Sequence, residues 1–456
     1  MSALVWLRRD LRRTDLPTLG AAHEAAAGRP VTVAVVIDPQ FFDNAGAARQ
    51  AWFAATVTAL QRSYDGRLCV RAGDPVRVIP ELASEIGAAS VHVSTETEPE
   101  GAARDRAVRR VLEAQGVAWI ETGSPYAVTP GRVRTRSGEG FQVFTPFSKA
   151  WLAHGWRPPA AEPAGLELAG VPDDGEAWER LTAALEQPGV PELPPAGEDA
   201  ALARWRSFLD DGLASYSAER DRADLDATSG MSPYLALGVV HPRTLLADLE
   251  ARGGESADRL RTELGWREFY GDVLAHHPDS LWHDLRPGLE GLSDWDDTEL
   301  VEAWRQGRTG HPFVDAGMRQ LLATGWMHNR VRMVVASFLT KDLHAHWTLG
   351  AGWFLSHLID GDLASNNHGW QWVAGTGSDA APYFRVFNPV LQGRRFDPAG
   401  DYVRRWVPEL AHVPGAAVHE PWDAPGAYDR GYPRPILDHG EERRVSLARY
   451  GALTRG

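Results

Sequence analysis

The chain has 456 residues, 43% of them hydrophobic, and a formal net charge of −14 at pH 7. This length fits about two or three domains, and the acidic charge gives no general affinity for nucleic acid, although a local basic patch can still bind it. The single cysteine, Cys69, excludes a disulfide framework, a Cys-ligated zinc site and an iron–sulfur cluster within one chain. Apolar runs stay well short of the roughly 18 residues of a membrane helix, so we expect a cytoplasmic protein without membrane attachment.

The first part of the chain alternates short apolar runs with helical segments. The runs are rich in β-branched residues, which is typical of strands buried on both faces of a parallel sheet. Helical segments such as Arg49–Leu60 and Ala102–Gln115 lie between them and predict a parallel βα sheet. The expected strands are Ala3–Leu7, Val31–Ile37, Leu68–Val70, Ser90–Ser94 and Val117–Glu121.

A Pro- and Gly-rich stretch separates this part from the rest of the chain. Its composition from residue 124 to 197 predicts a long surface linker that a short helix at Glu176–Glu186 interrupts. From Ala200 onward helical periodicity dominates, and 12 of the 18 tryptophans lie there. We therefore expect an α/β domain over residues 1–130, a linker over 131–199 and an all-α domain over 200–456.

The segment Trp326–Leu339 has the clearest helical pattern. Its apolar residues recur at helical spacing and define a core face. Asn329 and Met333 lie four residues apart on the opposite side, where a methionine suits the lining of a cavity. A tolerated surface methionine is the alternative. The core-face residues are Val331, Val334, Val335, Phe338 and Leu339.

The run from Ile359 to Trp372 combines two carboxylates, two adjacent amides and two indoles. Such polar residues are rarely buried without partners. Asp360 and Asp362 could bind a ligand or metal, but a helix cap or an ion pair to Arg332 would look the same. Trp370 and Trp372 would project about 200° apart on a helix, so one could face inward while the other lines a pocket, and two core tryptophans are the alternative.

Two further segments suit ligand binding. Thr228-Ser-Gly-Met-Ser232 carries hydroxyls and a glycine at a helix start, which can bind phosphate or simply cap the helix. Glu263, Trp266 and Tyr270 share one helical face, where a carboxylate beside an indole suits a flat heterocycle. An amphipathic core helix is the alternative. Neither a Walker-type loop nor a Gly-x-Gly-x-x-Gly motif is present.

The order of five motifs resembles that of the photolyase/cryptochrome family, over about residues 3 to 440. They are Trp-Leu-Arg-Arg-Asp-Leu-Arg at 6–12, Thr-Ser-Gly-Met-Ser at 228–232, Trp-Arg-Glu-Phe-Tyr at 266–270, Gly-Trp-Met-His-Asn-Arg-Val-Arg-Met at 325–333, and Asp-Gly-Asp…Asn-Asn-x-Gly-Trp-Gln-Trp at 360–372. The resemblance implies a Rossmann-like α/β antenna domain, a linker and an all-α FAD-binding catalytic domain. It also implies light-driven electron donation from reduced FAD to a pyrimidine dimer that is flipped out of UV-damaged DNA, by a monomer that needs no metal.

Site residues follow from the resemblance position by position. Asp360 and Asp362 match contacts to the flavin ring and ribose, Arg332 matches a partner of Asp360, and Asn366 matches the residue beside flavin N5. The FAD-phosphate cradle matches Tyr216, Thr228, Ser229, Gly230, Met231 and Ser232, with Gly361 between the two aspartates.

The substrate and electron-transfer residues are implied in the same way. Arg220 and Gln392 match DNA contacts, and Arg220 would contact phosphate. Trp370, Trp347 and Trp295 match a tryptophan chain that photoreduces FAD. The lesion pocket matches Glu263, Trp266, Asn329, Arg330, Met333 and Trp372. An arginine-rich surface for DNA could comprise Arg385, Arg394, Arg395, Arg404 and Arg405, although a solvated surface would look the same.

The residues at two positions indicate the subtype. Members that repair the (6–4) photoproduct carry histidines at the positions of Asn329 and Met333, and neither side chain here can act as a general acid. DASH-type members usually carry glutamine at the Met333 position. We therefore expect a class I enzyme for cyclobutane pyrimidine dimers. A cryptochrome photoreceptor and a flavin electron-transfer protein are the alternatives.

A second chromophore would be bound by the α/β domain. Glu98-Pro-Glu-Gly101 resembles the members that bind 8-hydroxy-5-deazaflavin more than those that bind methenyltetrahydrofolate, whose Asn-Glu pair would fall at Glu100-Gly101. Asp38, Arg49 and Glu98 are the candidate contacts to this antenna, which is optional in the family.

Overall fold

The computed structural model describes residues 2–172, 174–293, 299–378 and 384–454. The chain forms two compact units. Unit 1 comprises Met1–Leu213, Ser229–Pro278 and Ile359–Gly361, and unit 2 comprises Ala214–Thr228, Asp279–Leu358 and Asp362–Gly456. In the described ranges, no helix has the length and apolar character needed to cross a membrane.

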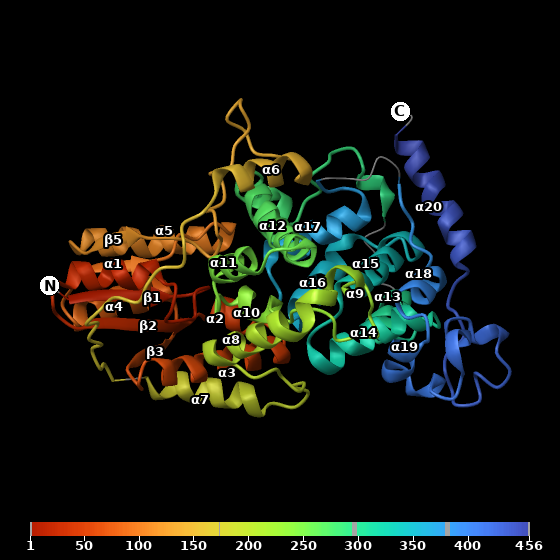
Figure 1. The fold of residues 1–456 in the computed structure, drawn as a ribbon, viewed down its shortest axis with the longest axis horizontal. Coiled ribbons are helices and arrows are strands. Elements are labelled where there is room, and N and C mark those ends of the chain that lie inside the picture. Colours follow the sequence, from red (N-terminus) through yellow and green to blue (C-terminus); the bar gives the residue numbers. More distant parts are fainter. Residues whose placement is uncertain (1, 173, 294–298, 379–383, 455–456) are drawn as a thin grey trace. The chain divides into compact units, whose positions relative to one another are not determined.

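Unit 1 contains a parallel five-stranded sheet, as the apolar runs predicted. Its strands are β1 (Ser2–Leu7), β2 (Val31–Ile37), β3 (Leu68–Ala72), β4 (Ala88–Val93) and β5 (Ala118–Glu121), of which β1, β2, β3 and β5 are labelled in Figure 1. The hydrogen-bonded order of the strands is β3-β2-β1-β4-β5. The strand order reverses direction between β1 and β4. In open α/β sheets this is the place where ligands bind, beyond the carboxyl ends of the strands.

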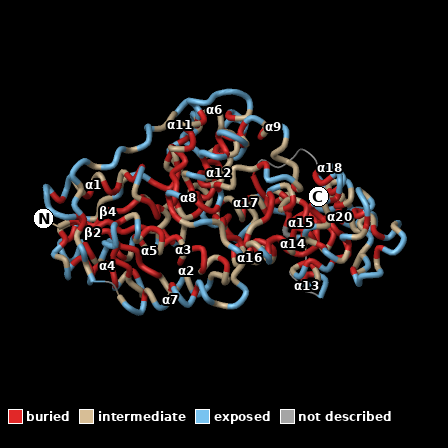
Figure 2. The backbone as a smooth tube through the Cα atoms, turned by 60° about the horizontal axis from the view of Figure 1, so that its bottom comes forward, coloured by how far each residue is buried: buried red, intermediate tan, exposed pale blue. Residues whose placement is uncertain are grey.

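Both faces of the sheet are covered, and β1, β2 and β4 are therefore buried throughout most of their length, whereas β5 at the edge of the sheet is partly exposed (Figure 2). Alternate residues of β1 point to opposite faces. Ala3, Val5 and Leu7 pack in one core with residues of α1, α3 and α7, and Leu4 and Trp6 pack in a second core with residues of α4 and α5. This explains why the runs are mainly apolar and do not alternate between apolar and polar residues. The helices of unit 1 are α1 (Pro17–Ala26), α2 (Pro39–Phe42), α3 (Ala47–Ser63), α4 (Pro75–Glu85), α5 (Pro99–Ala114), α6 (Phe144–His154), α7 (Gly175–Glu186), α8 (Glu198–Ser207), α10 (Ser232–Ala236), α11 (Pro242–Arg252) and α12 (Glu255–His276).

The stretch predicted as a surface linker contains one helix that its composition concealed. The predicted helix at 176–186 is present as α7, but α6 at Phe144–His154 was not predicted. Phe144, Phe147 and Trp151 are buried, and Phe147 packs against Phe269 of α12 with ring centroids 5.3 Å apart. The spacing i, i+3, i+7 of these three aromatic residues is the signal that could have revealed the helix.

The described part of unit 2 is helical. Its core is formed mainly by α14, α15, α16 and α17, whose apolar side chains belong to one cluster. The helices are α9 (Tyr216–Glu219), α13 (Glu299–Arg305), α14 (Pro312–Thr324), α15 (Asn329–Ser337), α16 (Trp347–His357), α17 (Leu363–Ala374), α18 (Pro389–Phe396), α19 (Asp401–Trp406) and α20 (His439–Leu453).

Helix α15 is shorter than the predicted segment Trp326–Leu339. It begins at Asn329 because His328 caps it, with Nδ1 accepting the backbone N–H of Arg330 at 3.1 Å. After Ser337 the chain continues as a π-helical turn over Phe338–Asp342. The predicted core face is confirmed, since all five of its apolar residues are buried.

Gly238 allows two segments of unit 1 to meet closely. Its φ is +65°, and a Cβ atom there would lie 1.9 Å from the carbonyl oxygen of Arg9 and 2.8 Å from Cα of Asp10. Leu11 donates its backbone N–H to Leu237 at 3.1 Å beside this contact. Only glycine satisfies both the left-handed conformation and the absence of space.

We predict that Gly238→Ala destabilises the protein by about 3 kcal/mol or more, because backbone atoms must separate in addition to the left-handed strain. Gly253→Ala is the matched control, since Gly253 has φ +64° and no neighbour within 4 Å, and it should lose only about 1 kcal/mol. Thermal unfolding of both variants measures the difference. Equal losses would show that the close contact contributes nothing.

Candidate cofactor and substrate site

Helix α12 presents the predicted ligand-binding face of unit 1. Glu263, Trp266 and Tyr270 are partly exposed, whereas Leu264 and Phe269 of the same helix are buried. Trp266 stacks on Phe144 with centroids 3.8 Å apart and planes inclined by 9°. One face of the indole is therefore covered by α6, and the ring is held in a fixed plane.

The segment Thr228-Ser-Gly-Met-Ser232 turns sharply ahead of α10. Gly230 has φ +67°, and a Cβ atom there would lie 3.0 Å from Nε of Arg204, which donates to the carbonyl of Ser229 at 3.1 Å. Met231 is buried, so within this loop its side chain serves packing. The side chains of Ser229 and Ser232 retain exposure. The hydrogen bond from Arg204 fixes the loop, and the hydroxyls of Ser229 and Ser232 remain accessible.

Two residues of the Asp360-Gly-Asp362 run have defined hydrogen bonds: Asp362 caps a helix, and Gly361 accepts from an arginine. In unit 2, Asp362 caps α17 by accepting the backbone N–H of Ser365 at 2.8 Å, so the cap considered from the sequence is confirmed. In unit 1, the guanidinium of Arg49 donates to the carbonyl of Gly361 at 3.4 Å. Arg49 was predicted as an antenna contact, and the structure places it on the predicted FAD motif.

The amide of Asn366 has only one possible orientation. Its Nδ2 donates to the carbonyl of Ala351 at 3.2 Å and to Oδ1 of Asn367 at 2.9 Å. Asn367 must present Oδ1 there, because its own Nδ2 donates to the carbonyl of Leu281 at 2.5 Å. Two acceptors therefore fix the NH₂ group of Asn366 inward, and Oδ1 is the atom that this partly exposed side chain presents on its other side.

The two described tryptophans of the predicted chain are core residues of unit 2. Trp370 is 3% exposed and Trp347 is 1% exposed. The ring of Trp370 lies against Gly350 of α16, where a Cβ atom would be 2.1 Å from it. Trp295, the third predicted member, lies outside the described residues. Sequence reasoning missed Trp304, whose ring centroid is 6.1 Å from that of Trp370.

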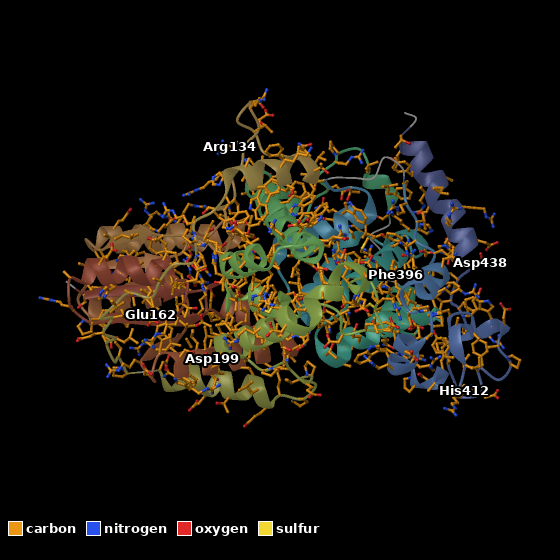
Figure 3. All side chains as sticks on the ribbon, viewed as in Figure 1. Arg134, Glu162, Asp199, Phe396, His412 and Asp438 are labelled. Atoms are coloured by element: carbon orange, nitrogen blue, oxygen red, sulfur yellow. The ribbon has the colours of Figure 1, made fainter. Side chains whose placement is uncertain are left out.

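The start of α15 carries three of the predicted substrate residues. Asn329 is exposed, and Arg330 pairs with Asp221 at 2.7 Å and donates to Sδ of Met333 at 3.6 Å. The Arg330 guanidinium also lies 5.1 Å from the ring of Phe396, which is labelled in Figure 3. Burial alone would favour the neutral form of Asp221, but the bonded Arg330 outweighs it and lowers the pKa of that carboxyl.

His328 is a positioning residue that the sequence did not single out. Its Nδ1 accepts the N–H of Arg330, and its Nε2 donates to the carbonyl of Arg220 at 3.0 Å. Burial lowers the pKa of this imidazole to about 4. The ring is therefore neutral at pH 7, as one acceptor and one donor require, and it joins the segment of Arg220 to α15.

The predicted DNA contacts differ in exposure. The Arg220 side chain is 9% exposed, 3.6 Å from Asp221 and over the ring of Tyr216 at 5.6 Å. Gln392 and Trp372 are partly exposed. Of the predicted arginine surface, Arg394 pairs with Glu420 and Arg404 pairs with Asp401, whereas Arg385, Arg395 and Arg405 are exposed.

The donor set of these residues fits a flavin better than a metal. No group of three or more His, Cys, Asp or Glu side chains among the described residues could hold a metal ion. The Asn366 amide offers an oriented acceptor oxygen, which suits an N–H group of a flat heterocycle. In unit 2 the Asp362 carboxylate suits the hydroxyls of a ribose, and in unit 1 the hydroxyls of Ser229 and Ser232 suit a phosphate.

Comparison with known proteins agrees with this chemistry. Residues 3–164 match the family described as DNA photolyase, and residues 260–452 match the FAD binding domain of DNA photolyase. A parallel sheet followed by a helical flavin-binding domain is the architecture that these two matches define. The chain belongs to the DNA photolyase family.

Relatives match over nearly the whole chain. A deoxyribodipyrimidine photo-lyase of Thermus thermophilus is 42% identical over 456 residues, which cover 99% of each chain. A crystal structure of a bacterial class III photolyase from Agrobacterium tumefaciens is 36% identical, with a TM-score of 0.89 over 100% of this chain and 98% of that one. A Synechocystis cryptochrome structure is 30% identical, with a TM-score of 0.86 over 98% of each chain.

Glu268 is a second residue whose role the motif at 266–270 did not reveal. It is buried, and its carboxylate accepts the backbone N–H groups of Ala127 and Val128 at 2.8 and 2.9 Å and the indole N–H of Trp151 at 3.3 Å. Burial raises the pKa of this carboxyl to about 7 in spite of these bonds. Glu268 thus holds the segment after β5 on α12.

We predict that Glu268→Gln flattens the pH dependence of stability. The folded protein keeps a proton that the unfolded chain releases near pH 4.5, so the wild type loses stability as pH rises from about 4.5 to 7. Between pH 5 and 7.5 the variant should gain about 2 kcal/mol relative to the wild type, measured by urea unfolding. Glu250→Gln, at an exposed carboxylate of α11, is the control. Parallel curves for E268Q and wild type would contradict the assignment.

Proposed function

We propose that this protein is a deoxyribodipyrimidine photolyase, which splits cyclobutane pyrimidine dimers in UV-damaged DNA by light-driven electron transfer. The observation that carries the proposal is the match over nearly the full chain to a relative of that name. The oriented amide of Asn366 agrees with it, because electron donation needs a reduced flavin.

FAD is the proposed cofactor. When bound, its reduced form supplies the electron that opens the dimer. Asp362 and Asp360 would hold the ribose and the ring, with Arg332 beside Asp360, and Asn366 would face N5. The phosphates would be held by Tyr216 and by the loop at Thr228–Ser232. The proposed domains are an antenna domain over residues 1–130, a linker over 131–199 and a catalytic domain over 200–456.

The role of Asn366 follows from its hydrogen bonds. The Asn366 side chain can accept an N–H at Oδ1. It cannot donate to a bare ring nitrogen, because its Nδ2 already donates to the carbonyl of Ala351 and to Oδ1 of Asn367. This arrangement favours a protonated N5 over an unprotonated one. The chain thereby stabilises the form of the cofactor that can donate an electron.

The lesion pocket is proposed at Glu263, Trp266, Asn329, Arg330, Met333 and Trp372. In unit 1 the indole of Trp266 can stack on a base, and in unit 2 the amide of Asn329 can form hydrogen bonds to one. Neither Asn329 nor Met333 can donate a proton as a general acid. A dimer that needs only an electron is therefore the proposed substrate, and the proposed class within the family is class I.

Photoreduction is proposed to run through Trp370, Trp347 and Trp295. Trp370 and Trp347 are both buried in the core of unit 2, where water cannot screen or quench a charge on an indole. Exposed arginines of α18 and α19, with Gln392 and Arg220, are the proposed contacts to DNA, and the protein is proposed to act as a monomer.

An antenna of the 8-hydroxy-5-deazaflavin type is proposed at the carboxyl ends of β1, β2 and β4. Asp38 follows β2 directly, and the Arg104 guanidinium of α5 lies 4.0 Å from it. Arg104 also lies over the rings of Trp6 and Phe41 at 5.0 and 5.5 Å. Burial raises the pKa of Asp38. Glu98 pairs with Arg9 near the same edge of the sheet.

Repair of UV-irradiated oligo-thymidine by the reduced protein is the decisive test. We expect absorbance at 260 nm to recover under blue light and to stay constant in the dark, because the broken dimers restore the thymine double bonds. A (6–4) photoproduct substrate should show no recovery. Full flavin loading without recovery on the cyclobutane substrate would favour the cryptochrome alternative, whose structure the chain also matches.

We predict that Trp370→Phe slows photoreduction of oxidised FAD by about tenfold or more, which corresponds to roughly 1.4 kcal/mol per tenfold in barrier. Repair by chemically reduced enzyme should be largely retained, because repair does not draw on the tryptophan chain. Absorbance of the flavin under illumination measures the first rate, and oligo-thymidine repair measures the second. An equal loss of both would contradict the proposed chain.

A further inference from the structure

The indole N–H of Trp347 ends on a carboxylate. Its Nε1 donates to Oδ1 of Asp284 at 2.7 Å, a short bond of the charge-assisted kind. Trp347 itself is fully buried, whereas Asp284 is partly exposed, so the carboxylate is hydrated on one side and bonded to the indole on the other.

Gln371 fixes the loop that carries Asp284. Its Oε1 accepts the backbone N–H of Leu285 at 2.9 Å, and its Nε2 donates to the carbonyls of Ser280 and His283 at 2.6 and 3.2 Å. The residues on both sides of Asp284 are thus bonded to one buried side chain of α17. The position of the carboxylate against Trp347 is built into the core.

The hydrogen bond to Asp284 distinguishes Trp347 from Trp304, which packs beside Trp370. Trp304 is 6.1 Å from Trp370 by ring centroids, but its Nε1 donates to the neutral carbonyl of Val335 at 3.0 Å. Trp347 lies one turn before Gly350 on α16, and the Trp370 ring rests on Gly350. Of these two described tryptophans, Trp347 is the one whose indole N–H is bonded to a carboxylate.

The imidazole next to this pair does not cancel the charge. His346 lies 5.7 Å from Trp347 by ring centroids, and its Nδ1 faces the N–H and hydroxyl of Thr348. Burial lowers the pKa of His346, against the opposing effect of Asp284. The ring is neutral at pH 7, and the carboxylate of Asp284 determines the local potential.

We propose that Asp284 directs photoreduction to Trp347 and accepts its proton. This inference rests on the proposed tryptophan chain. When Trp370 has lost an electron to the oxidised, light-excited flavin, Trp347 gives one electron to Trp370, and the proton on Nε1 of Trp347 moves to Asp284. Trp370 is restored and a neutral tryptophan radical remains. A thiol in solution then returns an electron to the buried Trp347 through the rest of the proposed chain, and Asp284 returns the proton.

Two forces favour this step. The negative charge of Asp284 stabilises the positive charge on the indole by Coulomb attraction, because the two groups are 2.7 Å apart and the indole is buried. Transfer of the proton then removes that positive charge from Trp347, so the electron cannot simply return from Trp370. Asp284 is a catalytic residue for photoreduction, and it has no part in the splitting of the dimer.

Asp284→Asn tests the proposal, because asparagine keeps the acceptor for the indole N–H and removes the charge and the proton acceptor. Transient absorption should show a deprotonated tryptophan radical in the wild type and a protonated radical cation in D284N. Steady-state photoreduction with a thiol should slow by about tenfold. Flavin content and repair by chemically reduced enzyme should be unchanged.

Asp248→Asn is the matched control. Asp248 accepts the indole N–H of Trp205 at 2.8 Å in unit 1. D248N therefore removes the same kind of charge from an indole partner outside the proposed chain, and its transients should equal those of the wild type. Trp347→Phe separates the two hypotheses. If W347F photoreduces normally, the chain itself is wrong. If W347F is slow but D284N shows wild-type transients, the role of Asp284 is overturned.

Discussion

Buried polar side chains that accept the backbone N–H groups of loops hold this structure in place. A buried N–H or carbonyl without a partner costs about 1–3 kcal/mol, so loops that cross a core need such partners. Glu268 and Asp272 of α12 receive backbone N–H groups from residues 127, 128 and 131. Asp315 of α14 receives those of Thr309 and Gly310. In each case a helix supplies the rigid element and one carboxylate places the loop.

Helix α17 applies this principle most densely. Asn366, Asn367, Trp370 and Gln371 lie within two turns, and each has a different task. Asn367 and Gln371 bind the segment from residue 280 to 285. Because that segment carries Asp284, the helix that bears Trp370 also places the carboxylate against Trp347. Helix α17 therefore positions both Trp370 and Asp284.

The sequence predicted the sheet well because its strands are buried on both faces. Nearly every position of β1 and β2 is then apolar, which gives a signal independent of tertiary context. Helix α6 was missed because proline and glycine dominate its surroundings, although three aromatic residues at helical spacing mark its buried face. The start of α15 was placed too early, because a histidine cap has no strong sequence signal compared with Ser or Asp.

The candidate site divides in the same way. The motif order indicated the residues and the family, but it could not predict hydrogen bonds between residues far apart in the sequence. The orientation of Asn366 depends on carbonyls of Ala351 and Leu281, 15 and 85 residues away in sequence. The role of Glu268 depends on a segment some 140 residues earlier. No local pattern contains such pairs.

The fixed amide of Asn366 has a consequence for substitutions at this position. An ionised aspartate there would direct a carboxylate oxygen at the carbonyl of Ala351 and at Oδ1 of Asn367, so three acceptors would meet without a donor. Turning Asn367 to offer its NH₂ group would break its bond to Leu281 and leave that buried carbonyl unsatisfied. A change from amide to acid at residue 366 therefore requires compensating changes at neighbouring positions. The hydrogen bonds around this residue favour asparagine even before a cofactor binds.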